Sequence, residues 1–427
     1  MNMNLKISNG RLVDPAHGTD AVRDIFIADG RVVALGTAPD GFAAQRVIDA
    51  QGLVVCPGLV DVAARLREPG FEYRATLDSE MTAAMAGGVT SLAIPPDTDP
   101  SLDEPGLVEM LCYRAKQLNC AHVYPIGALT VGLAGERLAE MSQLFDAGCF
   151  AFSQANVPIV DDTVLMRAMQ YAATFDFPVW LQPLAPFLAR TGNAHDGEVA
   201  ARLGLAGIPV AAETIALFAH LRLARATGAR LHVTRLSSAE GLALIEQARA
   251  DGMEVTCDVS INHLHLCDQD IGYFDPNCHL VPPLREASDR DALRAALAAG
   301  RIDALCSDHT PVDDDGKLTP FSESEPGATG LELLLSMTLQ WAEQDGVPLP
   351  TALARVTSDA ARLVGIRRGG HLAPGARADV CVFDPDARHT VTRERLKSQG
   401  KNTPFLGHEV PGLVRYTLVE GRVMYEG

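Results

Sequence analysis

The stretch that decides the fold is Pro57-Gly58-Leu59-Val60-Asp61-Val62-Ala63-Ala64-Arg65-Leu66-Arg67-Glu68-Pro69-Gly70. A short apolar run at its start predicts a buried strand, and the charged residues with the Pro-Gly pair predict a loop that follows the strand. Similar apolar runs recur along the chain, at residues 90–94, 123–126, 150–152, 179–181, 231–233, 254–256 and 304–306. Helical patterns lie between them, at residues 216–227, 239–250 and 289–299, the last with a predicted Ser288 or Asp289 cap.

This alternation of strands and helices over residues 57–369 predicts an α/β fold, a (β/α)8 TIM-type barrel with a parallel sheet. Functional groups of such barrels lie on the loops that follow the strands. Residues 1–56 and 370–427 instead carry short strand patterns and tight turns, such as residues 28–30 and 420–422. We predict that both ends of the chain form one small composite β-sandwich domain.

Composition excludes several classes of function. The chain has 36 Lys+Arg against 54 Asp+Glu, a net charge of −18, which argues against nucleic acids and anionic membranes as partners. No apolar run is long enough to span a membrane, and residues 1–10 lack the pattern of a secretory signal. Nine scattered cysteines without a Cys-x-x-Cys pair indicate a cytoplasmic protein with reduced thiols. No lysine lies between Lys116 and Lys317.

The motifs along the chain resemble those of the dihydroorotases of the amidohydrolase superfamily. Leu-Arg-Glu-Pro-Gly at 66–70 is the most specific, and four others follow in the family's order. They are Pro-Pro-Leu-Arg at 282–285, Asp-His-Thr-Pro at 308–311, Gly-Ala-Thr-Gly-Leu-Glu at 327–332 and Asn-Thr-Pro-Phe at 402–405. The resemblance covers the whole chain and implies an amidohydrolase barrel. Dihydroorotases open or close a cyclic amide with zinc ions that activate water.

The resemblance also identifies the metal-ligand positions, and their residues do not suit zinc. Ala63 and Arg65 replace a His-x-His pair, Gln154 lies where a lysine carbamate or an aspartate is expected, and Gln182 and Arg235 replace two histidines. Alanine has no donor atom, and arginine keeps its proton and repels cations. We expect no metal and no other cofactor.

Asp308 occupies the family's acid/base position and has two interpretations. It either acts as an acid or base, or it forms ion pairs with Arg65 and Arg235 in the volume that the metal would occupy. We favour the ion pairs, because a buried carboxylate without a cation is costly.

The positions implied for substrate binding are Arg67, Asn277 and Gly327. Arg67 is either a vestigial anion site or a structural residue of the loop. Two neighbouring positions depart from the family: Asp97 replaces an asparagine, and Val312 replaces a histidine.

Two further features carry alternatives. His263 and His265 would share one face if their segment were a strand, and His232, His279 and His309 could then complete a relocated metal site. Histidines that only satisfy local hydrogen bonds are the alternative. The acidic run at residues 313–315 is either a solvated loop tip or a lid segment.

Three functions follow from the resemblance. Degenerate dihydroorotases lacking the metal ligands are companions of aspartate transcarbamoylase in bacterial pyrimidine (UMP) synthesis. The first function is such an inactive structural subunit, in an oligomeric assembly with the aspartate transcarbamoylase catalytic subunit. The second is an active dihydroorotase or other cyclic-amide hydrolase with a metal-free or relocated site. The third is a sensor that binds a pyrimidine precursor through Arg67 and Asn277 without turnover.

Overall fold

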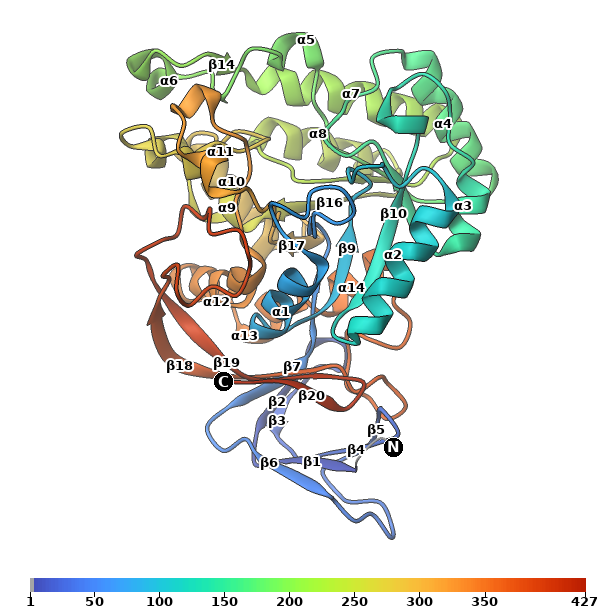
Figure 1. Cartoon of the computed structure of the whole chain (residues 1–427), viewed down its shortest axis with the longest axis vertical. Helices are drawn as coiled ribbons and strands as arrows, with labels where there is room; N and C mark the ends of the chain where they lie inside the picture. Colours follow the sequence, from blue (N-terminus) through green and yellow to red (C-terminus); the bar gives the residue numbers. More distant parts are fainter. Residues whose placement is uncertain (1–3) are drawn as a thin grey trace.

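The computed structural model describes residues 4–427. Residues 1–3, part of the segment 1–10 considered above for a secretory signal, lie outside the described residues. Its centre is a sheet of eight parallel strands in chain order, which curls into the predicted barrel (Figure 1). The strands are β8 (Leu59–Asp61), β9 (Val89–Ile94), β10 (His122–Ala128), β11 (Ala151–Ser153), β12 (Val179–Leu181), β15 (Leu231–Val233), β16 (Val255–Ser260) and β17 (Ala304–Cys306).

The barrel closes where the first and last strands end. Arg65 N donates to the His309 carbonyl at 2.8 Å, and His309 N donates to the Ala63 carbonyl at 3.2 Å. The buried Asp61 carboxylate crosses the same seam and accepts hydrogen bonds from the Ser307 backbone N–H, at 3.1 Å, and from the Ser307 hydroxyl. The seam therefore holds the loops after β8 and β17 next to each other.

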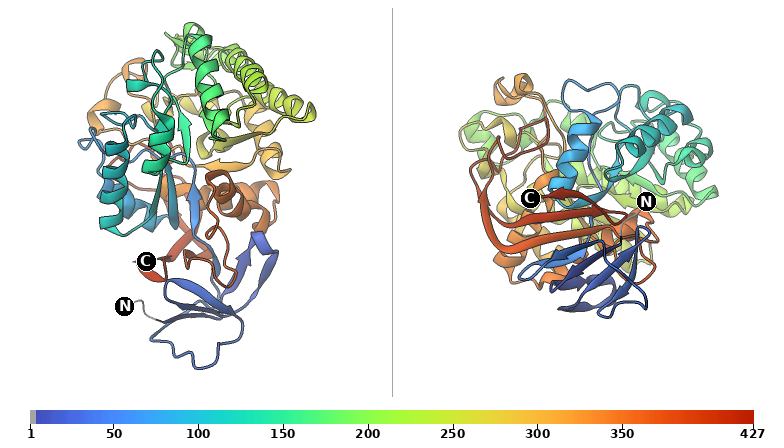
Figure 2. Two further views of the ribbon diagram at one scale, coloured as in Figure 1. Left: turned by 90° about the vertical axis from the view of Figure 1, so that its right-hand side faces the viewer. Right: turned by 60° about the horizontal axis from the view of Figure 1, so that its bottom comes forward.

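Helices surround the barrel and bury their apolar faces against it (Figures 1 and 2). The longer ones are α1 (Leu77–Ala86), α2 (Pro105–Leu118), α3 (Met141–Ala147), α4 (Asp162–Thr174), α7 (Val210–Thr227), α8 (Ala239–Ala250), α10 (Ala287–Ala298), α12 (Leu334–Asp345), α13 (Leu349–Ala354) and α14 (Ser358–Val364). Shorter pieces lie in the connecting loops: α5 (Pro186–Ala189), α6 (Glu198–Leu203), α9 (Ile261–His265), α11 (Asp314–Lys317), and the two-residue strands β13 (Ala194–His195) and β14 (Gly207–Ile208).

The predicted start of α10 is wrong by two residues. The helix begins after Glu286, so neither Ser288 nor Asp289 caps it. The Asp289 carboxylate instead accepts a hydrogen bond from Ala239 N at 2.8 Å, at the start of α8. The Asp289 carboxylate therefore binds a backbone N–H at the N-terminus of the neighbouring helix α8 instead of capping its own helix.

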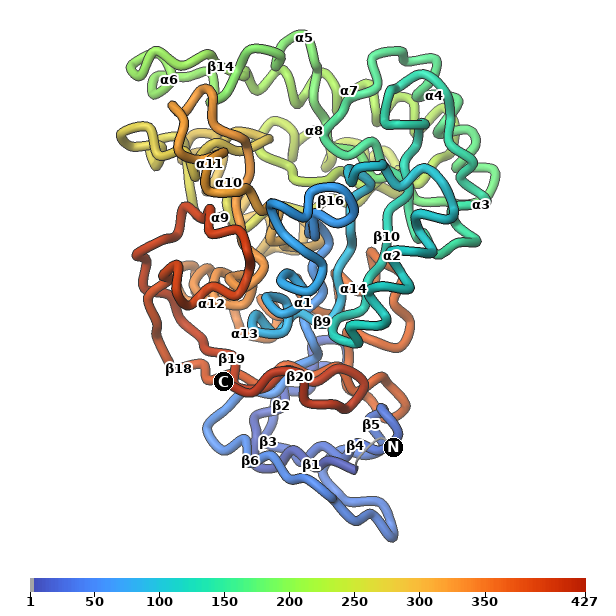
Figure 3. Tube along the Cα trace, in the orientation of Figure 1, coloured from blue at the N-terminus to red at the C-terminus, as the bar shows by residue number. Residues whose placement is uncertain are grey.

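The two ends of the chain form the second β-rich unit, as predicted (Figure 3). A six-stranded sheet has the order β20 (Arg422–Glu426), β19 (Glu409–Val419), β18 (Val380–Thr390), β7 (Val54–Pro57), β2 (Arg11–Asp14) and β3 (Thr19–Val22). A four-stranded sheet has the order β5 (Arg31–Leu35), β4 (Ile25–Ala28), β1 (Leu5–Ser8) and β6 (Arg46–Asp49). A separate apolar cluster lies between these sheets.

Two observations bear on the compositional predictions. Within residues 4–427, none of the helices combines the length and apolar character that a membrane crossing requires. All nine cysteines are free thiols, and seven of them are buried.

Candidate functional site at the barrel mouth

The loops that follow the strands bring six polar side chains, four of them buried, into one cluster, called the arginine cluster below. Its members are Arg65, Asp97, Asn156, Gln182, Arg235 and Asp308. They come from the loops after β8, β9, β11, β12, β15 and β17. The carboxyl ends of parallel strands meet at one edge of the barrel, which is why residues so distant in sequence converge.

Arg65 is held from three sides and is 5% exposed. Its Nε donates to Asp97 Oδ2 at 2.8 Å, and its Nη2 donates to Asn156 Oδ1 at 3.0 Å. Its Nη1 donates to Thr310 Oγ1 at 3.1 Å and lies 3.5 Å from Asp308 Oδ1. The guanidinium group thus has a partner on each of its nitrogens.

Arg235 approaches the same centre from the opposite side of the barrel. Its Nη1 lies 3.2 Å from Asp308 Oδ1, and its Nη2 donates to Gln182 Oε1 at 2.7 Å and Asn156 Oδ1 at 2.6 Å. Its backbone N–H donates to the buried Asp258 carboxylate at 3.0 Å, which holds the residue at a φ of 53°. Both guanidinium groups therefore pair with Asp308, the arrangement predicted from the sequence.

The cluster offsets the cost of burying its carboxylates. Burial raises the pKa of Asp308 above its ordinary value, and the Arg235 and Arg65 guanidinium groups oppose that rise. Burial alone would also raise the pKa of Asp97, but Arg65 holds it below the ordinary value. Asp97, where the family has an asparagine, therefore serves as a counter-charge for Arg65.

Backbone strain concentrates at this mouth. Arg67, Ala155, Arg235 and Asp308 all have left-handed backbone conformations, with φ between 49° and 63°. Such conformations are uncommon outside glycine and asparagine and persist where surrounding structure enforces them. Strained backbone of this kind clusters at functional sites, and here it lies around the arginine cluster.

The structure does not bring Gln154 into the arginine cluster. Its amide Nε2 donates to Thr130 Oγ1 and to the Leu133 carbonyl, both at 2.8 Å. Asn156, two residues further on, takes the central place and accepts from both arginines. The sequence analysis missed Asn156; its polar side chain just after the β11 strand pattern was the available signal.

Little space remains between the arginines. A cavity of about 20 Å³ lies beside Ala63, Arg65, Ala155, Trp180 and Arg235, enough for about one water molecule. Pockets for small organic ligands are usually more than ten times larger. The Arg65 and Arg235 side chains both line this small cavity.

The residues at this mouth do not fit a zinc ion. Two of the expected ligand positions are arginines with fixed positive charge, and Gln182 directs its one oxygen at Arg235. Over residues 4–427, no three or more His, Cys, Asp or Glu side chains gather in a way that could hold a metal.

His263 and His265 would share a face only in a strand, and residues 261–265 form helix α9 instead. In a helix, side chains two positions apart point to different sides. His263 Nε2 lies 3.1 Å from the Pro283 carbonyl, whereas His265 Nε2 lies 2.9 Å from the Met337 carbonyl.

His279 and His309 also have local partners. His309 Nε2 lies 2.6 Å from Glu80 Oε2, so its ring points away from its neighbour Asp308. His279 Nδ1 lies 3.0 Å from Ser324 Oγ. These contacts correspond to the structural alternative for the histidines.

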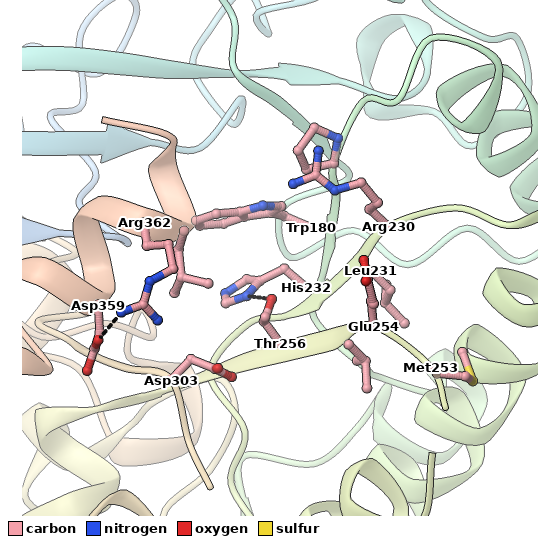
Figure 4. A pocket seen from close by; sticks show the side chains of 13 residues that line it. Trp180, Arg230, Leu231, His232, Met253, Glu254, Thr256, Asp303, Asp359 and Arg362 are labelled. Atoms are coloured by element: carbon pink, nitrogen blue, oxygen red, sulfur yellow. Dashed lines mark hydrogen bonds and ion pairs between the residues drawn. The ribbon is translucent and has the colours of Figure 1, made fainter. Parts of the chain in front are cut away.

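His232 is the middle residue of β15 and is buried inside the barrel. Its ring packs on Trp180, with centroids 4.1 Å apart, and its nitrogens lie 2.8 Å from Thr256 Oγ1 and Asp258 Oδ2. The two rings border a cavity of about 400 Å³ at the amino ends of β15 and β16 (Figure 4). Because barrel chemistry takes place at the carboxyl ends of the strands, this cavity is not the counterpart of the family's active site.

Arg67 lies near the cluster without a carboxylate partner. Its Nε donates to the Pro311 carbonyl at 2.9 Å, and its guanidinium lies over Phe71. Burial lowers the pKa of Arg67 to about 10, and the positive charge of Arg65 adds to the effect. Within the described chain it forms no ion pair.

Asn277 and Gly327 do not join the arginine cluster. Asn277 lies in a single-turn helix at Pro276–Cys278, and its backbone N–H donates to the Asp275 carboxylate at 2.9 Å. Gly327 has a φ of 135°, and a Cβ there would lie 2.4 Å from Thr310 Cγ2. Its carbonyl accepts a hydrogen bond from Asn402 Nδ2. This bond links the motif at residues 327–332 to the motif at residues 402–405, which gives both a structural role.

The acidic run at residues 313–315 leaves Asp314 and Asp315 exposed to solvent, and it forms the start of the short helix α11. Asp313 caps the short helix α11 by accepting from Gly316 N at 3.3 Å. Asp314 pairs with Arg393 at 2.7 Å, and Lys317 Nζ donates to the Pro276 carbonyl at 2.8 Å. The segment is therefore tied to its surroundings at both ends.

Comparison with known proteins agrees with this architecture. The family pattern described as "Dihydro-orotase-like" matches residues 52–241, and that described as "Amidohydrolase family" matches residues 151–425. The solved L-hydantoinase of Arthrobacter aurescens has a TM-score of 0.89 to this chain at 26% identity, covering 99% of this chain and 96% of its own. Fold and mouth thus define an amidohydrolase-type barrel.

Full-length relatives narrow the assignment. A protein of Pseudomonas aeruginosa named "Dihydroorotase-like protein" is 45% identical over 425 residues, covering all of both chains. A protein of Geobacter metallireducens named "Dihydroorotase" is 38% identical over 424 residues, covering 99% of this chain and all of its own. The chain belongs to the dihydroorotase-like family.

Replacing Asp308 by alanine tests the arginine cluster. We expect Asp308→Ala to lower the free energy of unfolding by about 3 kcal/mol, because two buried guanidinium groups lose their shared counter-charge. Urea unfolding followed by circular dichroism measures it. The control is Asp314→Ala, which removes an exposed ion pair and should cost less than about 1 kcal/mol. An Asp308→Ala variant as stable as the parent would contradict the structural role.

The buried His263 should make the protein sensitive to acid. Burial lowers the pKa of His263 to about 4, so the unfolded chain binds a proton below pH 6.5 that the folded chain does not. Stability from this group is complete above pH 6.5 and is lost as the pH falls toward 4. Between pH 7 and pH 5 we expect a loss of about 2 kcal/mol that His263→Gln does not show.

Urea unfolding at the two pH values measures this difference. The exposed His408→Gln variant serves as the control and should follow the parent. Identical pH dependence in parent and His263→Gln would show that His263 takes no part.

Proposed function

We propose that this chain is a catalytically inactive dihydroorotase-like subunit of de novo pyrimidine (UMP) biosynthesis, whose role is to support the aspartate transcarbamoylase catalytic subunit in an oligomeric assembly. The observation that carries the proposal is the arginine cluster, in which Arg65 and Arg235 pair with Asp308 across the barrel mouth.

The chemistry of a cyclic-amide hydrolase supports this reading. Hydrolysis needs an activated water and a substrate carbonyl at the same place. At this mouth the nearest carboxylate is paired with two cations, and the adjoining cavity of about 20 Å³ has no room for a ring. The alternative of an active hydrolase with a metal-free or relocated site requires a second group of convergent acid and base side chains. We propose that no metal or other cofactor takes part.

The pattern of change supports a role in shape. Asn402 holds the loops after β17 together, accepting from Val312 N at 3.0 Å and donating to the Thr310 and Gly327 carbonyls. Residues that hold the fold together, such as Asn402, are therefore present, whereas the positions expected to bind metal have residue types that do not bind zinc. The transcarbamoylase is proposed as the partner because the dihydroorotase resemblance implies it. The free thiols favour a cytoplasmic location.

Co-expression with the aspartate transcarbamoylase of the same cell tests the proposal. We expect the two chains to co-elute as one large assembly, and we expect transcarbamoylase activity to fall at least tenfold when this chain is omitted. The purified chain should show no dihydroorotate hydrolysis, with or without added zinc.

Two results would overturn the proposal. One is separate elution with full transcarbamoylase activity in the absence of this chain. The other is dihydroorotate turnover that a Zn²⁺ chelator or the Asp308→Asn substitution abolishes.

A second candidate, binding of a pyrimidine precursor without turnover, is favoured by Arg67. Its guanidinium is buried, has one hydrogen bond to a carbonyl, and lacks a carboxylate partner among residues 4–427. A buried cation of this kind is compensated when an anion binds.

Titration calorimetry with carbamoyl aspartate tests the second candidate. If Arg67 is an anion site, the parent should bind and Arg67→Met should bind at least tenfold more weakly. The control is Arg74→Met, which removes a nearby arginine already paired with Glu325. Absence of heat with the parent would eliminate this candidate and leave the structural role untouched.

A further inference from the structure

The outer face of helices α5 and α7 exposes large apolar side chains. Phe187 and Leu188 of α5 are 72% and 43% exposed, and Ile215 and Phe218 of α7 are each 56% exposed. The two helices lie side by side (Figure 1), and Ala185 N, just before α5, donates to the Ala212 carbonyl of α7 at 2.7 Å. Exposed apolar residues gathered on neighbouring helices mark interaction sites in folded proteins. These four residues are called the α5/α7 face below.

The sequence of α7 shows why no acidic side chain lies on this face. Ala211, Ile215, Phe218 and Arg222 recur at intervals of four, three and four residues, which places them on one side of the helix. The only carboxylate of the helix, Glu213, is buried and accepts hydrogen bonds from the serines at 237 and 238. The solvent side of α7 therefore carries no negative charge.

Two arginines flank the α5/α7 face. Arg190 follows α5 directly, and Arg222 lies one turn beyond Phe218. Both are exposed, and neither makes a hydrogen bond or ion pair within residues 4–427. This basic border stands on a chain whose net charge is −18.

The residue types also match those of protein interfaces. Aromatic residues and arginine are enriched in interfaces, and lysine is depleted. The face lies inside the lysine-free span between Lys116 and Lys317. An apolar centre with an arginine border fits a partner surface that has an apolar centre bordered by carboxylates.

We propose that the α5/α7 face is the surface through which this chain binds the transcarbamoylase catalytic subunit, and that the matching surface there is apolar with an acidic border. This inference rests on the proposed function for the identity of the partner. A second copy of this chain fits less well, because a twofold interface would set Arg190 and Arg222 against the same basic border.

The experiment measures binding of the purified full-length chain to the purified transcarbamoylase catalytic subunit by sedimentation velocity and titration calorimetry. The test variants are Phe218→Asp, which places a charge in the apolar centre, and Arg222→Glu, which reverses the border. The matched control is Tyr113→Asp on α2, where a 63% exposed aromatic residue lies outside the face. Because all three residues are exposed, circular dichroism should be unchanged.

We expect Phe218→Asp to weaken binding at least tenfold and the control to leave it unchanged. Arg222→Glu should weaken binding several-fold at low salt and make it less sensitive to added salt. If the parent and both test variants bind equally, the α5/α7 face is not the binding surface, and the proposed function is unaffected. Failure of the parent to bind would overturn both. Loss of self-association without a change in transcarbamoylase binding would assign the face to a second copy.

Discussion

The ion pairs of Asp308 with Arg65 and Arg235 are the constraint around which the barrel mouth is arranged. Two buried cations and a buried anion are stable only when further hydrogen bonds satisfy them, and Asn156 and Gln182 supply those bonds. The same contacts tie together loops from strands on opposite sides of the barrel. A metal bound by several strands would cross-link such a mouth, and the two guanidinium groups make a comparable cross-link here.

The fold was accessible from the sequence because each barrel strand is a short apolar run between turn signals, and the two β-rich ends are separated by a long alternating segment. The arginine pairing was accessible for a different reason: an arginine cannot lose its charge, so Arg65 and Arg235 near Asp308 allow few arrangements. Positions set by local backbone detail were not accessible. Asn156 and not Gln154 reaches the arginine cluster, and Ala155 between them has a φ of 50°.

The histidines illustrate the same limit. A His-x-His spacing has opposite meanings in a strand and in a helix, and the five residues of α9 are too few for periodicity to decide between them. The motifs of the chain did not reveal which groups their residues contact. Gly327 and Asn402 occupy the expected places in the chain, yet their contacts are with the backbone of neighbouring loops.

The strand order of the small domain has a consequence for how the chain acquires its structure during synthesis. β7 pairs with β2 on one side and with β18 on the other, so its second neighbour is made more than 300 residues later. The β7 edge must therefore stay unpaired until the barrel and residues Val380–Phe383 of β18 have left the ribosome. A chain interrupted late in synthesis would carry a complete barrel beside an open sheet edge, a form prone to aggregation.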